Sequence, residues 1–225
     1  MRMLLLAALG MAGSLQAQVA AEANSGYQTE QGRKSVAKTL ANPERDNVQN
    51  PGKLVRGMGV KAGMTVADVG TGIGYMLPYL SRAVGPSGKV IAEDIFDDFL
   101  EGAKQLGENA KLANVTFVKG TATDPNLPEA QLDVVLALDV YHHFDYPDKM
   151  LAAIGKSLKP DGRLVIVEYY KRPDAMPNGR AMTHIRLDMP DVIKEVEANR
   201  FHLVSERETI KNVQYMLVLE KSSSK

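Results

Sequence analysis

The 225-residue sequence predicts an α/β fold, with a mostly parallel seven-stranded sheet, helices on both faces and an antiparallel last strand. Two observations support this prediction. From Lys61 onward, short apolar stretches alternate with amphipathic ones, which is the pattern of parallel strands joined by helices. The chain then closes with two strand-like stretches separated by a short turn and no helix, which indicates a final hairpin.

Residues 1–21 have the layout of a secretory signal peptide. Arg2 precedes an apolar run at residues 3–12, small residues follow, and the run is too short for a comfortable transmembrane helix. Cleavage is expected after Ala17, with Ala21 as the alternative. A cleaved leader implies a periplasmic or secreted protein. An uncleaved helix or a wrongly assigned start would leave it cytoplasmic, and no later segment is expected to span a membrane.

Residues 22–50 are polar, and residues 22–58 are expected to form a helical extension before the domain at 59–225. After a mobile start, a helix is predicted near Gln31–Ala41, followed by a turn at Asn42 and Pro43. Pro51 is suited to open a second helix, because its fixed φ and missing N–H fit the first helical turn.

Within the domain, β-branched and apolar residues mark the strands, and turn residues such as those of "GPSG" (85–88) and Pro160-Asp161-Gly162 end the helices. Strands are predicted at 64–70, 89–94, 115–120, 133–140, 163–170, 202–210 and 213–221, and helices at 75–85, 97–113, 148–159 and 189–201.

The first strand runs into a glycine-rich turn, "DVGTGIG", and then into a helix. Glycines permit a tight turn and close backbone approach to a ligand, and the helix start offers unpaired N–H groups. The dinucleotide fingerprint needs glycines at positions one, three and six, but here Gly70, Gly72 and Gly74 occupy one, three and five. An NAD(P)-dependent oxidoreductase is therefore the weaker alternative. Tyr146 and Lys149 are also one residue too close for its Tyr-x-x-x-Lys pair.

The turn resembles motif I of the class I S-adenosylmethionine-dependent methyltransferases, an acid followed by glycines at alternate positions. Four further stretches are similar to that family: "GKVIAED", "VKGTATDPNLP", "DVVLALDVYHHF" and "LKPDGRLVIVEYY". The resemblance runs from about Lys61 to Lys221. It implies a Rossmann-like sheet, S-adenosyl-L-methionine as cofactor and transfer of a methyl group to an acceptor.

The resemblance also implies cofactor-binding residues. The loop would contribute Asp68, Gly70, Thr71, Gly72 and Gly74, with Asp68 partly holding the turn. Asp94 would bind both ribose hydroxyls, since a carboxylate can accept two O–H bonds from a cis-diol. Its neighbour Glu93 is the rival and should point the other way.

The remaining cofactor contacts are implied less directly. Ile95 would lie against adenine. The family often places an acid after the glycine of the third-strand loop, but here Thr121 follows, so Thr121, the Ala122 backbone or Asp124 would take over. Asp139 would touch the amino-acid end of the cofactor.

Candidate catalytic residues follow the fourth strand, at the edge where ligands bind in open parallel sheets. His142 or His143 could act as a base, and Tyr141 could orient the acceptor, although capping or packing roles would explain the same residues. Farther along, His184 and Arg186 lie in a long loop that could form a lid. Upstream, Arg45 and Gln49 could fold over the cofactor.

No metal site is expected. Neighbouring histidines such as His142 and His143 diverge, and the sequence offers no reason for His184 or His202 to converge on them. Neutral net charge, from 27 basic and 27 acidic residues, argues against nucleic acid and favours a small-molecule acceptor. An exported binding protein without turnover remains an alternative, and the oligomeric state stays open.

Overall fold

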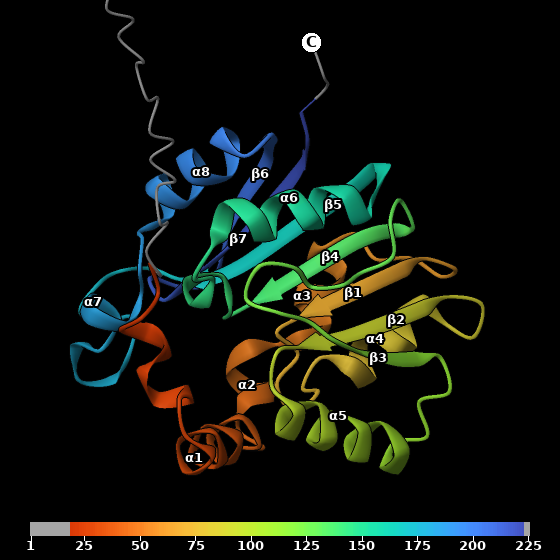
Figure 1. Cartoon of the computed structure of the whole chain (residues 1–225), viewed down its shortest axis with the longest axis horizontal. Helices are drawn as coiled ribbons and strands as arrows, with labels where there is room; N and C mark the ends of the chain where they lie inside the picture. Colours follow the sequence, from red (N-terminus) through yellow and green to blue (C-terminus); the bar gives the residue numbers. More distant parts are fainter. Residues whose placement is uncertain (1–18, 223–225) are drawn as a thin grey trace, which may run out of the picture.

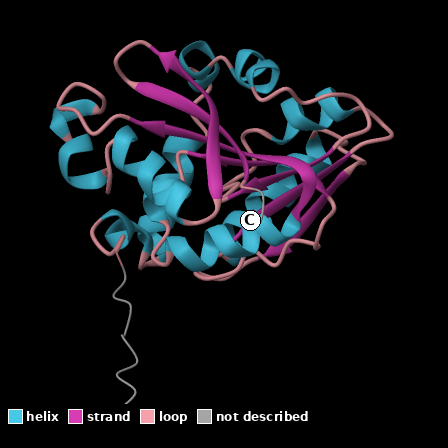
Figure 2. Cartoon of the chain, turned by 90° about the horizontal axis from the view of Figure 1, so that it is seen from above, coloured by secondary structure: helices cyan, strands magenta, loops and turns pink. Residues whose placement is uncertain are grey.

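The computed structural model describes residues 19–222, which form one seven-stranded sheet with helices on both faces (Figures 1 and 2). The strands lie in the order β3-β2-β1-β4-β5-β7-β6, and β7 runs antiparallel to both of its neighbours. Their bounds are β1 Thr65–Val69, β2 Lys89–Asp94, β3 Val115–Lys119, β4 Leu132–Leu138, β5 Leu158–Tyr169, β6 Phe201–Ile210 and β7 Gln214–Lys221. The predicted fold class is confirmed.

Two apolar layers hold the helices onto the sheet, because successive strand residues point to opposite faces. Val66 belongs to the layer under α3 (Pro51–Gly57), α4 (Leu77–Val84) and α5 (Asp97–Asn109). Its neighbour Ala67 belongs to the layer on the other face. That layer includes side chains of α6 (Pro147–Ser157) and α8 (Met189–Ala198).

The strand order reverses between β1 and β4. From β1 the chain continues to β2 and β3 on one side, and from β4 it continues to β5, β6 and β7 on the other. Ligands of open α/β sheets bind beyond the carboxyl ends of the strands at such a point. The loops after β1, β2 and β4 meet there, and α1 (Glu30–Leu40) and α2 (Arg45–Gln49) lie beside them (Figure 1).

The N-terminal segment differs from its prediction as a mobile start. Ala20 and Ala23 are buried, and the Val19 N–H donates to the Asp145 carbonyl at 3.2 Å. A short 3₁₀ turn at Ala23–Tyr27 then leads into α1. Small side chains carry this packing, so the apolar periodicity that reveals a helix or strand is absent here.

Other departures are local. The short helices α2 and α7 (Ala181–His184) were not predicted. Strand β5 begins at Leu158, earlier than expected, because Leu158 pairs with Leu132 across an irregularity in the register. The predicted leader falls largely on residues 1–18, and its first cleavage position is among them, outside the described residues. Within residues 19–222, no helix combines the length and the apolar character needed to cross a bilayer.

Candidate functional site

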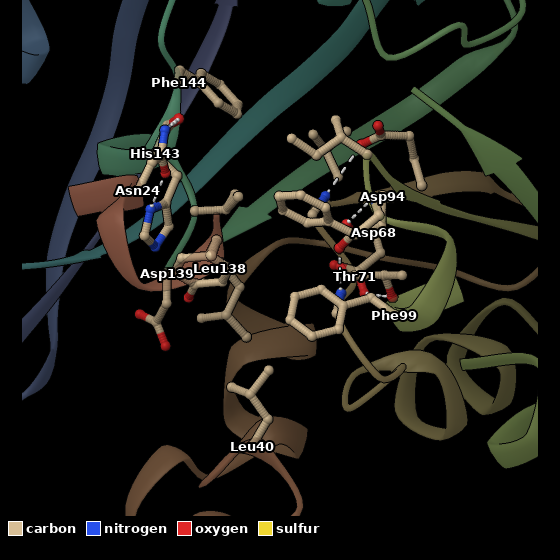
Figure 3. Close-up of a pocket in the computed structure, with 18 of the residues that line it drawn as sticks. Asn24, Leu40, Asp68, Thr71, Asp94, Phe99, Leu138, Asp139, His143 and Phe144 are labelled. Carbon is tan, nitrogen blue, oxygen red and sulfur yellow. Dashed lines mark hydrogen bonds between the residues drawn. The ribbon is translucent and has the colours of Figure 1, made fainter. Parts of the chain in front are cut away.

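A cavity of about 320 Å³ lies at the carboxyl ends of the parallel strands (Figure 3). This volume is in the range of small-molecule sites. Nine of the ten predicted cofactor residues line it, namely Asp68, Gly70, Thr71, Gly72, Asp94, Ile95, Thr121, Ala122 and Asp139. His143, one of the predicted catalytic residues, lines it as well. The prediction that these residues share one site agrees with the geometry, whereas Gly74, Tyr141 and His142 are not part of the lining.

The glycine loop adopts a backbone that side chains would obstruct. Gly70 and Gly72 have φ of +67° and +57°, in the left-handed region. A Cβ on Gly70 would meet Val140 Cγ2 at 2.3 Å. Gly74 has another role, because a Cβ there would meet Leu77 Cδ1 at 2.9 Å and the Ala103 Cα at 3.2 Å. The first two glycines therefore shape the cavity wall, and the third lets the loop pack against α5.

Buried acids hold this loop in place. The Thr71 hydroxyl donates to Asp68 Oδ2 at 2.8 Å, and the Gly70 N–H donates to Glu93 Oε2 at 3.2 Å. The Gly72 N–H donates to Asp94 Oδ2 at 2.9 Å. Glu93 was predicted to point away from the site, yet it lines the cavity and accepts the N–H of Gly70, the first glycine of the loop.

Asp94 uses both of its carboxylate oxygens. Oδ1 accepts the Phe96 N–H at 3.0 Å, and Oδ2 accepts the Gly72 N–H. A carboxylate offers about four lone-pair directions, so each oxygen can accept one more donor from the cavity. Two neighbouring hydroxyl groups of a ribose match this pair of acceptors.

Burial shifts the pKa values of the acids around the cavity upward, because a charged group is poorly solvated there. It raises the pKa of Asp68 to about 7 and that of Asp94 to about 6. Burial, together with the charge of Glu168, raises the pKa of Asp139 to about 7. The pKa of Glu93 also lies well above its usual value, through burial and then the neighbouring Asp94.

An aromatic and apolar wall lies beside Asp94. Ile95, Phe96 and Phe99 line the cavity there, and the Phe96 and Phe99 rings meet edge to face with centroids 5.8 Å apart. Thr121 also lines the cavity, but its hydroxyl oxygen accepts the Asp124 N–H at 3.0 Å within its own turn. Asp124 is not part of the lining, so the Ala122 backbone is the better placed of the three predicted adenine contacts.

The N-terminal extension reaches the site through Asp139, whose φ is +52°. Asp139 Oδ1 accepts the Gln214 side-chain amide at 2.8 Å, and Oδ2 lies 3.5 Å from Arg45 Nη2. Gln214 Oε1 in turn accepts the Gln49 amide at 2.7 Å. Arg45 and Gln49, the two upstream residues predicted to fold over the cofactor, thus contact Asp139, Arg45 directly and Gln49 through Gln214. Gln214 was missed, since nothing near it in the sequence marks a ligand site.

The far end of the cavity is closed by the segment before α1. Asn24 Nδ2 donates to the His143 carbonyl at 3.0 Å, and Asn24 Oδ1 accepts from His143 Nδ1 at 2.7 Å (Figure 3). The Tyr27 ring lies edge-on to the His143 ring with centroids 4.7 Å apart. Burial lowers the pKa of His143 well below its usual value, so its ring is neutral near pH 7.

Two of the proposed catalytic side chains lie behind the cavity wall. The buried Tyr141 hydroxyl donates to Glu195 Oε1 at 2.6 Å, and Arg186 pairs with the same carboxylate. His142 is buried and contacts Glu168 through Nδ1 at 2.6 Å. This placement gives no support to a direct role for Tyr141 or Arg186 at the acceptor. His143 is the one of the three catalytic candidates that faces the cavity.

Comparison with known proteins agrees with this geometry. Residues 67–166 match the family model described as "Methyltransferase domain". The structure is similar to the crystal structure of a SAM dependent methyltransferase from Aquifex aeolicus, with a TM-score of 0.75 and 28% identity over 82% of this chain and 96% of the other. Residues 67–166 thus match a methyltransferase domain, and the fold is that of a SAM dependent methyltransferase. S-adenosylmethionine is the cofactor that this similarity implies.

Curated relatives share the central part of the chain. The ubiquinone/menaquinone biosynthesis C-methyltransferase UbiE of Pseudomonas putida (strain GB-1) is 32% identical over 114 residues, which are 50% of this chain and 44% of that protein. UbiE of Hahella chejuensis (strain KCTC 2396) is 34% identical over 114 residues, 50% of this chain and 46% of that protein. The chain thus spans about half the length of the curated relatives it matches.

Proposed function

We propose that the whole chain is an S-adenosylmethionine-dependent methyltransferase that acts on a small-molecule acceptor. The observation that carries this proposal is Asp94, which lines the cavity and whose two oxygens each accept one backbone N–H. Each carboxylate oxygen has a further lone pair for another donor. Asp94 ends β2 beside a glycine loop whose backbone lines the same cavity. Bound there, S-adenosylmethionine supplies a methyl carbon on a sulfonium, and the protein orients the acceptor and excludes water.

The size and closure of the cavity support a small acceptor. The volume is about 320 Å³, and Asn24, Tyr27, Leu40 and Arg45 from the N-terminal extension all contribute to the lining. The balanced charge of the chain is consistent with this assignment.

His143 is our candidate for the group that accepts a proton from the acceptor. The Asn24 side-chain nitrogen, Nδ2, donates to the His143 carbonyl. The Asn24 side-chain oxygen, Oδ1, is therefore the atom that faces His143 Nδ1. The proton of the neutral ring is therefore on Nδ1, and Nε2 carries the free lone pair. A neutral imidazole with a free lone pair suits proton abstraction near neutral pH.

Calorimetric titration of S-adenosylmethionine, and separately NADH, into residues 18–225 tests the proposal. We expect binding of S-adenosylmethionine and none of NADH. Binding of NADH alone would refute the methyltransferase assignment in favour of an oxidoreductase. Cofactor binding without methyl transfer to any member of a small-molecule library would favour the non-catalytic binding protein.

We also propose that the chain is exported and cleaved after Ala17, on the strength of the leader-like sequence at residues 1–21. Cleavage after Ala21 would remove Ala20, which is only 2% exposed, together with the Val19 contact to Asp145. Mass spectrometry of the protein from cell fractions tests this. An intact Met1 in the cytoplasmic fraction would contradict export.

A further inference from the structure

Three histidines converge at the cavity wall, contrary to the expectation that His184 would stay apart. His142 and His143 follow β4, and His184 ends α7, about forty residues later in the chain. One ring nitrogen from each histidine lies within 4.8 Å of the others. The His142 and His184 Nε2 atoms are 3.2 Å apart.

His142 is oriented by a buried carboxylate. Glu168 Oε2 lies 2.6 Å from His142 Nδ1 and also accepts the His142 backbone N–H at 3.2 Å. Glu168 Oε1 accepts the Tyr169 N–H at 2.7 Å. With its Nδ1 proton held by the carboxylate, His142 directs the lone pair of Nε2 at His184. A carboxylate behind a histidine in this way is the usual support for a metal ligand.

His143 has an equivalent support from Asn24, whose oxygen holds the Nδ1 proton and leaves Nε2 free. Two of the three rings thus have a fixed tautomer with a free Nε2. The separation of the His142 and His184 nitrogens also fits a metal, because two ligands on tetrahedral zinc, at about 2.0–2.1 Å each, lie about 3.3 Å apart.

We propose that His142, His143 and His184 bind one divalent transition-metal ion of the zinc class. Imidazole-only ligand sets suit zinc, copper, nickel and cobalt, whereas magnesium and calcium prefer oxygen ligands. A hydrogen bond between His142 and His184 also accounts for the 3.2 Å distance in the absence of metal. Such a hydrogen bond would not require a third histidine nearby. It would also not require Glu168 and Asn24, which fix the tautomers of His142 and His143.

The surrounding charges favour a cation on one side and oppose it on the other. Glu168 is 1% exposed and contributes a buried acidic group directly behind His142. Arg180 Nη2 lies 3.4 Å from His184 Nε2 and opposes a metal at that nitrogen. Arg180 is exposed, so its guanidinium can turn into solvent when the ion binds.

Three protein ligands leave a fourth position open, as in catalytic zinc sites. His143 lines the cavity, so the ion lies at the wall near the acceptor side. If the proposed methyltransferase function holds, the open position takes an oxygen, nitrogen or sulfur atom of the acceptor. In the metal-bound form His143 Nε2 is a ligand and does not act as the base. The acceptor atom therefore releases its proton to solvent, and its lone pair forms the bond to the methyl carbon as the carbon–sulfur bond breaks.

The test is calorimetric titration of Zn²⁺, and of Co²⁺ followed by visible absorption, into tag-free protein. We expect one ion per chain with the absorption of tetrahedral Co²⁺. His184→Ala should weaken Zn²⁺ binding at least tenfold, and Glu168→Gln should weaken it by about 10–100-fold. The control is His202→Ala, which removes an exposed histidine of β6 and should leave affinity unchanged.

A measurement on the unmodified chain covers the case in which a variant fails to fold. In ¹⁵N spectra of the histidine rings, Zn²⁺ should shift the signals of His142, His143 and His184 and leave His202 in place. No binding by the wild type, equal binding by His184→Ala, or a shift confined to His202 would overturn the metal site. Titration of S-adenosylmethionine into the same samples separates the two proposals, because metal binding without cofactor binding would refute only the methyltransferase function.

Discussion

Replacing Asp94 with Ala is the sharpest test of the cofactor site. If both carboxylate oxygens accept a ribose hydroxyl, the variant loses two hydrogen bonds to a charged group, at about 1.5 kcal/mol each. The total of about 3 kcal/mol corresponds to a dissociation constant for S-adenosylhomocysteine raised roughly a hundredfold. Calorimetry at pH 8 measures this directly. The matched control is Asp97→Ala, whose side chain is 78% exposed and pairs with Lys119.

Two further measurements separate ribose binding from support of the loop, because the variant also leaves the Gly72 and Phe96 N–H groups without their acceptor. An analogue without the 2′- and 3′-hydroxyls should bind the wild type much more weakly than S-adenosylhomocysteine does, and the variant should not distinguish the two. Affinity should also fall from pH 8 to pH 5, since the pKa of Asp94 is about 6. Wild-type discrimination retained by Asp94→Ala would refute the ribose assignment.

Three other predictions concern the same region. Gly70→Ala should lower stability more than Gly179→Ala, by about 1–3 kcal/mol. Gly70 and Gly179 have φ of +67° and +69°, but a Cβ on Gly70 would meet Val140 Cγ2 at 2.3 Å, whereas one on Gly179 would lie 3.9 Å from its nearest neighbour, so equal melting temperatures would contradict the clash. Burial raises the pKa of Asp68 from 3.8 to about 7, so between these pH values the folded state holds a proton that the unfolded chain has lost. Stability to urea in the absence of ligand should therefore fall as pH rises through this window, and Asp68→Asn should flatten the fall; an unchanged slope would count against it. His143→Ala should reduce kcat by about 10²–10⁴-fold if this ring is the base, and full turnover would exclude that role.

Much of the candidate cofactor site could be predicted from sequence because its parts are local. The order strand, acid, glycines and helix at residues 65–84 identifies a ligand loop within one short segment. Asp94 was identified as a second ligand-binding acid because it lies at the end of the next predicted strand. The parallel register between β1 and β2 then brings these two strand ends together without further information.

The contacts of the N-terminal extension and of His184 could not be predicted, because they join distant segments. Asn24 reaches His143 across 119 positions, and Gln49 reaches Gln214 across 165. His184 approaches His142 only because the loop after β5 folds back and forms α7. None of these pairs has a spacing or periodicity that a single sequence displays.

The link from Gln49 to Gln214 and Asp139 has a consequence for how the protein is made. Ribosomes deliver the chain from its N-terminus, so the glycine loop, Asp94 and Asp139 all emerge before Gln214. Until β7 inserts between β5 and β6, Asp139 lacks its amide donor and β5 has an unpaired edge. Strand β7, which is synthesised after the glycine loop and Asp94, therefore supplies the side-chain amide that holds Asp139. A nascent chain that has not reached Gln214 carries the cofactor motif without this support.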